Sequence, residues 1–176
     1  LEAMRAKVIR IFDSVFVSTD SAGFAEPAYG VVGDTPLDNE PVVRDALAIL
    51  TLGNRAIAQS TFEQCLRSPF IGEAGEELGL RSLAVASLRS LAETELSLVM
   101  WLQQLSTNWP ESGLTARVNR LYESLNSRPR RQAPSAWGRA FSKDLAVMGW
   151  PGGIALTETE DAAVRRFEMV LDDLAA

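Results

Sequence analysis

Apolar residues recur at helical spacing along most of this chain, and this period limits the possible folds more than any other feature. The clearest series is Leu114, Val118, Leu121 and Leu125, in which each apolar residue follows the last by three or four positions. That spacing places the side chains on one face of an α-helix, because a helix completes a turn every 3.6 residues. No βαβ alternation, internal repeat or long heptad run accompanies it, so we expect an all-α fold.

The same period, interrupted by proline and glycine, predicts an irregular domain of about eight helices. We expect helices over residues 4–16, 41–52, 60–67, 73–93, about 94–107, 114–125, 135–148 and from 157 to the end. Segment 18–39 is rich in Gly, Pro and Asp, which indicates a loop. Within it, a short apolar run near 29–33 is a candidate extended segment.

Local signals predict several helix boundaries. Pro41 suits the first turn of a helix, where its missing N–H has no helical partner. Two segments, Ser60–Glu63 and Thr157–Glu160, match the capping box, in which a Ser or Thr and a Glu each bond the other's backbone N–H. Pro69 predicts the end of the helix before it, and Gly149–Gly153 predicts a turn.

Length and composition indicate a single helical domain that we expect to be cytoplasmic. The chain has 176 residues, 47% of them hydrophobic, which is enough for one substantial core. Its single cysteine, Cys65, fits a reducing cytosol and is expected to be a buried small hydrophobe rather than a reactive thiol. There is neither an apolar run of about 18 residues nor a signal peptide. The chain begins at Leu1 rather than Met, so we expect an excised internal fragment of a larger protein.

The usual catalytic constellations are missing from the sequence. The chain has no histidine, which excludes Ser-His-Asp and Cys-His catalysis and most zinc sites. Neither Lys7 nor Lys143 lies in a P-loop or follows a carboxylate at the spacing of a PD-(D/E)XK nuclease. Carboxylate groups such as Glu73–Glu77 lie at predicted helix starts, where they favour the helix dipole. We therefore expect no catalysis, cofactor or metal in this chain.

One segment, residues 111–140, reverses the charge of the chain, which is −6 overall. A net negative charge argues against a free-standing nucleic-acid binder but leaves room for a local basic face. Six arginines oppose only two glutamates there, and arginine forks suit phosphate oxygens, with Trp137 as a candidate for stacking on a base. The alternatives are a solvated surface, a face that docks acidic parts of a parent protein, and a core role for Trp137. The candidate DNA-binding residues are Arg117, Arg120, Arg128, Arg130, Arg131 and Arg139.

Three separated segments carry a resemblance to a known family. The first runs from about Tyr29 to Arg89, the second is Trp137 to Phe141 followed by Met148–Gly152 (MGWPG), and the third is the final helix after Thr157. In the first, the matching residues are Gly33, Pro36-Leu37, Pro41-Val42, Ala46-Leu47 and the run Leu66–Gly72 (LRSPFIG). In order and spacing they resemble the RecB/AddB-type superfamily I helicase-nucleases. More narrowly, the chain is similar to bacterial "probable DNA repair proteins", which have an inactivated helicase core and end in a PD-(D/E)XK nuclease.

The resemblance implies a non-catalytic domain like the helical 2B insertion of the helicase core, with the motor and exonuclease parts elsewhere in the parent. Such a domain would act in DNA repair and recombination by positioning DNA or neighbouring domains. The alternative is a scaffold or protein-interaction domain that does not touch nucleic acid. Arginines gathered on one exposed face would favour the first reading, whereas their dispersal or pairing with Asp and Glu would favour the second.

Overall fold

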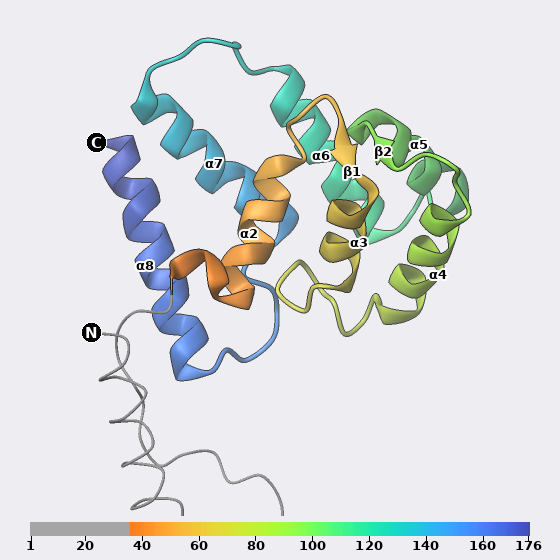
Figure 1. Cartoon of the computed structure of the whole chain (residues 1–176), viewed down its shortest axis with the longest axis horizontal. Helices are drawn as coiled ribbons and strands as arrows, with labels where there is room; N and C mark the ends of the chain where they lie inside the picture. The colour runs from red at the N-terminus through yellow and green to blue at the C-terminus, as the bar shows by residue number, and fades with distance from the viewer. Residues whose placement is uncertain (1–35) are drawn as a thin grey trace, which may run out of the picture. The chain divides into compact units, whose positions relative to one another are not determined.

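The computed structural model describes residues 36–176, which are helical over most of their length (Figure 1). Its elements are the 3-10 turn η1 (Leu37–Asn39), α2 (Pro41–Thr51), β1 (Ile57–Ala58), α3 (Gln59–Arg67), α4 (Leu78–Arg89), β2 (Glu95–Leu96), α5 (Leu98–Asn108), α6 (Gly113–Asn126), α7 (Pro134–Met148) and α8 (Glu158–Ala175). The prediction of an all-α irregular multi-helix fold is confirmed. The helix expected at 4–16 and the extended segment expected near 29–33 lie outside the described residues.

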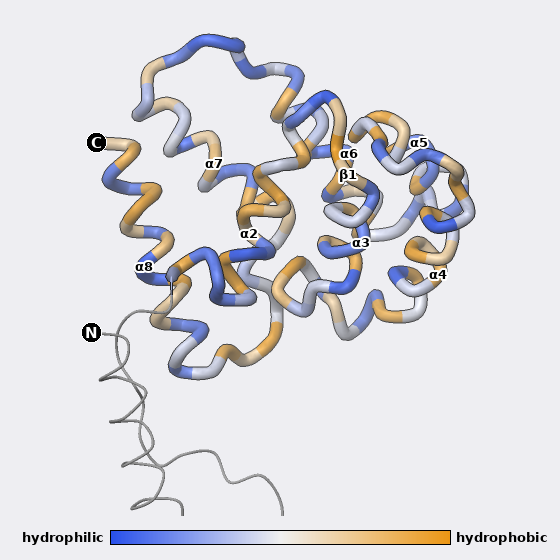
Figure 2. Tube along the Cα trace, viewed as in Figure 1, coloured by the Kyte–Doolittle hydropathy of each residue, from blue (hydrophilic) through white to orange (hydrophobic). Residues whose placement is uncertain are grey.

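Helix α2 lies at the centre of this region, where it packs against α3, α7 and α8 (Figure 1). Pro41 occupies its first turn, as predicted, and its capping residue is Glu40. Val42, Val43 and Ile49 are almost completely buried. Burying a helix on several sides requires such apolar residues around most of its circumference. Figure 2 shows the resulting contrast between the apolar centre and the hydrophilic loop that joins α6 to α7.

Polar side chains cap three of the helices. Thr157 and Glu160 form the predicted capping box at the start of α8, with both reciprocal bonds present. Ser97 and Ser112 each accept a hydrogen bond from the backbone N–H three residues later, at the starts of α5 and α6. Each cap satisfies a donor that the first helical turn leaves without a partner.

The capping box predicted at Ser60–Glu63 is wrong. Helix α3 begins one residue earlier, its capping residue is Ala58, and no side chain caps it. A two-residue antiparallel ladder between β1 and β2 sets this start, with Ile57 opposite Leu96. The sequence pattern missed the ladder because its partners lie almost forty residues apart.

The long helix predicted over 73–93 is shorter than expected, and the next one starts later than residue 94. Helix α4 covers only Leu78–Arg89, and α5 begins at Leu98 after the β2 residues. Residues 69–77 instead form turns that lead from α3 to α4. Within α4, Leu83 is 60% exposed whereas Arg81 is buried. None of the helices within residues 36–176 has both the length and the hydropathy that spanning a bilayer requires.

Candidate functional site

Two of the motif segments meet in what we call the glycine junction, formed by residues 66–72 and 148–153. The backbone N–H of Gly72 donates to the carbonyl of Gly149 at 3.0 Å, and that of Gly153 donates to the carbonyl of Gly72 at 3.3 Å. Gly72 and Gly149 both adopt left-handed backbone conformations, with φ of 56° and 74°. A Cβ on Gly149 would lie 2.9 Å from the Cα of Gly72. Only glycine satisfies both the conformation and the close approach.

The start of α2, which carries the Pro41-Val42 motif, is joined to the glycine junction by Trp150. The indole Nε1 of Trp150 donates to the carbonyl of Val42 at 2.8 Å, across 108 residues of sequence. Its ring also packs edge-on against Phe167 of α8, with ring centroids 5.8 Å apart. The bond satisfies a buried N–H that would otherwise be costly. The start of α2 is thereby fixed to the glycine junction.

Three charged side chains hold the segment between α3 and α4 in place. Glu77 receives hydrogen bonds from both Arg81 and Arg117, with Arg117 Nη2 2.6 Å from Glu77 Oε1. Arg81 also donates to the backbone carbonyls of Ser68, at 3.0 Å, and Ile71. The side chains of Arg81, Arg117 and Glu77 are only 3%, 11% and 12% exposed.

This charge cluster bears on one of the predicted DNA-binding residues. The guanidinium of Arg117 lies over Gly72, where a Cβ would come within 2.5 Å of the Arg117 Cζ. Arg117 therefore acts within the fold, joining α6 to the glycine junction. Sequence reasoning assigned Glu77 to a helix start and gave Arg81 no role, because their partners are distant in sequence. Glu77 and Arg81 are four residues apart, and opposite charges at that spacing can pair on one helix face. This spacing is the signal in the sequence that could have indicated their contact.

A second buried ion pair involves another of the predicted arginines. Arg128 Nη2 lies 2.7 Å from Asp144 Oδ1, and these side chains are 10% and 3% exposed. Ser124 donates to the same carboxylate oxygen at 3.0 Å. The Arg128 guanidinium lies 5.5 Å from the centre of the Trp137 ring, a cation–π distance. Arg128 and Trp137 thus tie the α6–α7 loop to α7.

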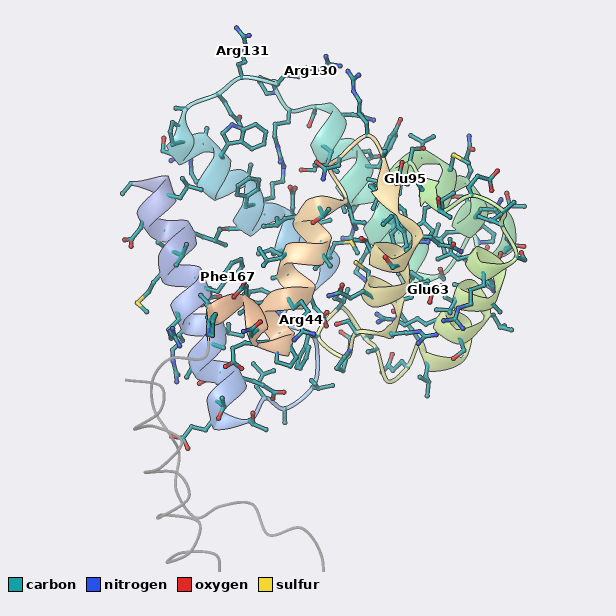
Figure 3. The ribbon with its side chains drawn as sticks, in the orientation of Figure 1. Arg44, Glu63, Glu95, Arg130, Arg131 and Phe167 are labelled. Atoms are coloured by element: carbon teal, nitrogen blue, oxygen red, sulfur yellow. The ribbon has the colours of Figure 1, made fainter. Side chains whose placement is uncertain are left out.

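The other four candidate arginines are exposed. Arg120 contacts the carbonyl of Ala116 on its own helix, at 3.4 Å. Arg139 lies 3.5 Å from the carbonyl of Ala175 near the end of α8. Figure 3 shows Arg130 and Arg131 projecting outward from the α6–α7 loop.

Arg130 and Arg131 differ from the other candidates in their partners. Within residues 36–176 neither forms an ion pair or a side-chain hydrogen bond. Both guanidinium groups can therefore bind an anion without losing an ion pair or a side-chain hydrogen bond to residues 36–176. Arg120 and Arg139 also form no ion pair with the described residues, but each lies near a backbone carbonyl.

The described residues give little support to a reactive thiol or a metal site. Cys65 is buried, and this burial raises the pKa of its thiol to about 12, which disfavours the reactive thiolate. In the part of the chain that the structure describes, no group of three or more Cys, Asp or Glu side chains is placed to hold a metal ion.

Comparison of the chain with protein-family models, curated protein sequences and solved structures gives no match.

Proposed function

We propose that this chain is a non-catalytic helical domain of a bacterial superfamily I helicase-like DNA repair and recombination protein. Its role would be to position DNA or neighbouring domains of the parent. The observation that carries the proposal is the meeting of the motif segments around Val42, Leu66–Gly72 and Met148–Gly152. These segments are far apart in sequence, yet Met148–Gly152 is hydrogen-bonded to both of the others.

The contacts at the glycine junction indicate that the residues shared with the family support the fold. Gly72 and Gly149 supply left-handed turns and a close backbone approach, and Trp150 supplies a hydrogen bond to α2. All three residues serve architecture rather than chemistry. A resemblance carried by such residues supports a shared helical domain, and it gives no support to a catalytic centre in this chain.

DNA contact through the α6–α7 loop is the more specific part of the proposal. Arg130 and Arg131 are adjacent, exposed and without acidic partners among the described residues. Phosphate contacts of this kind release counterions and give binding that weakens with salt.

The scaffold alternative also has an observation in its favour. Arg117 and Arg128, two of the six predicted arginines, form buried ion pairs with Glu77 and Asp144. Pairing of this kind is expected of a domain that works through its shape. DNA binding and scaffolding therefore need an experiment that leaves these ion pairs intact.

The test is fluorescence anisotropy of labelled single-stranded and duplex DNA, titrated with the whole chain over a salt series. The test variant is Arg130→Ala/Arg131→Ala. Its matched control is Arg165→Ala/Arg166→Ala, which removes the same charge from exposed positions on α8. We expect affinity to fall steeply with salt, and the salt slope to decrease by about 2 in the test variant alone.

Two results would overturn DNA contact through this loop. One is the absence of binding at low salt, which would leave the scaffold function. The other is an equal loss of affinity in the test and control variants, which would show that only net charge matters.

A further inference from the structure

A groove of about 750 Å³ lies between the end of α3, the turns that follow it, and one face of α4. Leu66 and Val85 form part of its buried floor. At its edges Leu78 is 68% exposed and Ile154 is 39% exposed. Large apolar side chains that are this exposed around a groove indicate a surface whose burial against a partner would lower the free energy.

The charges in the groove have one sign. Its lining includes Arg67, Arg81 and Arg89 but no carboxylate, although acidic residues outnumber basic ones in the whole chain. Arg81 is buried and fully engaged with Glu77 and backbone carbonyls. The basic character that a ligand could meet therefore comes from the other two arginines.

Arg67 and Arg89 retain capacity for a further anion. Both pair with the single carboxylate of Glu63, at 3.7 and 2.8 Å, but their side chains remain 57% and 58% exposed. A guanidinium has five N–H donors, and Arg89 gives Glu63 only its Nε and one Nη. Two guanidinium groups facing one carboxylate leave an excess positive charge at this edge of the groove (Figure 3 labels Glu63).

We propose that this groove binds the apolar face of an amphipathic helix that carries carboxylates along its flank. The α4 residues in the lining, including Leu78, Ser82 and Arg89, recur at helical spacing and follow the axis of α4. A helix laid along α4 would place leucines on the apolar floor and carboxylates against Arg67 and Arg89. A nucleic-acid backbone would satisfy the arginines but would leave the apolar floor uncovered. This site is separate from the α6–α7 loop.

The test uses two synthetic helical peptides with the same leucine face, one flanked by glutamates and one by lysines. Binding to the whole chain is measured by fluorescence anisotropy. We expect the glutamate peptide to bind at least tenfold more tightly than the lysine peptide. We also expect Leu78→Ser to weaken its binding at least fivefold, and Arg67→Gln/Arg89→Gln to abolish the preference between peptides.

Leu83→Ser is the matched control, because Leu83 is 60% exposed on the same helix but does not line the groove. It should leave binding unchanged, and circular dichroism should show all three variants to be folded. The proposal is overturned if the two peptides bind equally, if neither binds, or if Leu83→Ser weakens binding as much as Leu78→Ser. Displacement of the peptide by single-stranded DNA would also overturn it, by assigning the groove to nucleic acid.

Discussion

The charge cluster beside the glycine junction and the α6–α7 loop both contain arginines, and these arginines have opposite roles. In the cluster, Arg81 and Arg117 are almost completely buried against Glu77. At the outer edge of the loop, Arg130 and Arg131 are exposed, with no ion pair to any of residues 36–176. A cluster of arginines in a sequence therefore says little about binding until the partners of each one are known.

The difference follows from the cost of burying charge. A guanidinium that is removed from water loses its hydration, and ion pairs and hydrogen bonds must replace it. Removing the partner then leaves an uncompensated buried charge. An exposed guanidinium keeps its water and loses little when it is alone. We therefore expect substitutions in the charge cluster and the glycine junction to change stability, and substitutions at the outer edge of the loop to change only binding.

Replacing the carboxylate of Glu77 should have the largest effect. Glu77→Gln leaves Arg81 and Arg117 buried without a counter-charge, and we expect the free energy of unfolding to fall by about 3–5 kcal/mol. Urea denaturation followed by circular dichroism measures it. Glu76→Gln is the control, because Glu76 is exposed and forms no ion pair with other described residues. Equal stability of the two variants would mean that the buried cluster contributes nothing.

Adding a methyl group at Gly149 should have the next largest effect. Gly149→Ala forces a side chain into a left-handed conformation, at a cost of about 1–2 kcal/mol, and drives its Cβ towards the Cα of Gly72. Thermal and urea unfolding measure the loss. Gly79→Ala on α4 is the control, since its Cβ would meet nothing within 4 Å. We expect that control to gain up to about 1 kcal/mol, because alanine favours the helix. A Gly149→Ala protein as stable as the parent would contradict the tight junction.

The pair of Glu63 and Arg89, in which the Arg89 side chain is 58% exposed, should give the smallest effect. The hydrogen bond from Arg89 holds the pKa of Glu63 below its usual value of 4.5. A carboxyl whose pKa is lowered by folding stabilises the protein at pH values above the pKa of the unfolded state. This contribution is lost as the pH falls through the lower pKa of the folded state. The difference in unfolding free energy between the parent and Glu63→Gln should therefore shrink below pH 4.5. NMR titration should also show that Arg89→Gln raises the pKa of Glu63, and an unchanged pKa would contradict the assignment.

Most of the fold could be predicted from the sequence because it depends on local patterns. Helical spacing places the helices, Pro41 marks the start of α2, and the capping box at Thr157 marks the start of α8. The errors come from contacts between distant residues. The β1–β2 ladder moved the start of α3, and the hydrogen bonds of Arg81 to the turns after α3 accompany the shortened α4.

The candidate site could be predicted only in part, because charge patterning does not reveal which side chains are paired. The sequence places Arg117 and Arg128 among basic neighbours, whereas their partners, Glu77 and Asp144, lie 40 and 16 residues away. Arg130 and Arg131 keep the exposure that the sequence suggested. Their contact with DNA remains a prediction.

The most direct test of the contrast between buried, paired arginines and exposed arginines measures the unfolding free energies of four single variants under identical conditions. They are Arg117→Gln, Arg128→Gln, Arg130→Gln and Arg131→Gln, which all remove the same charge. We expect losses of at least about 2 kcal/mol for the first two, because their partners are buried. For the last two we expect changes within about 0.5 kcal/mol. Equal losses in all four would contradict the division of the arginines into structural and available groups.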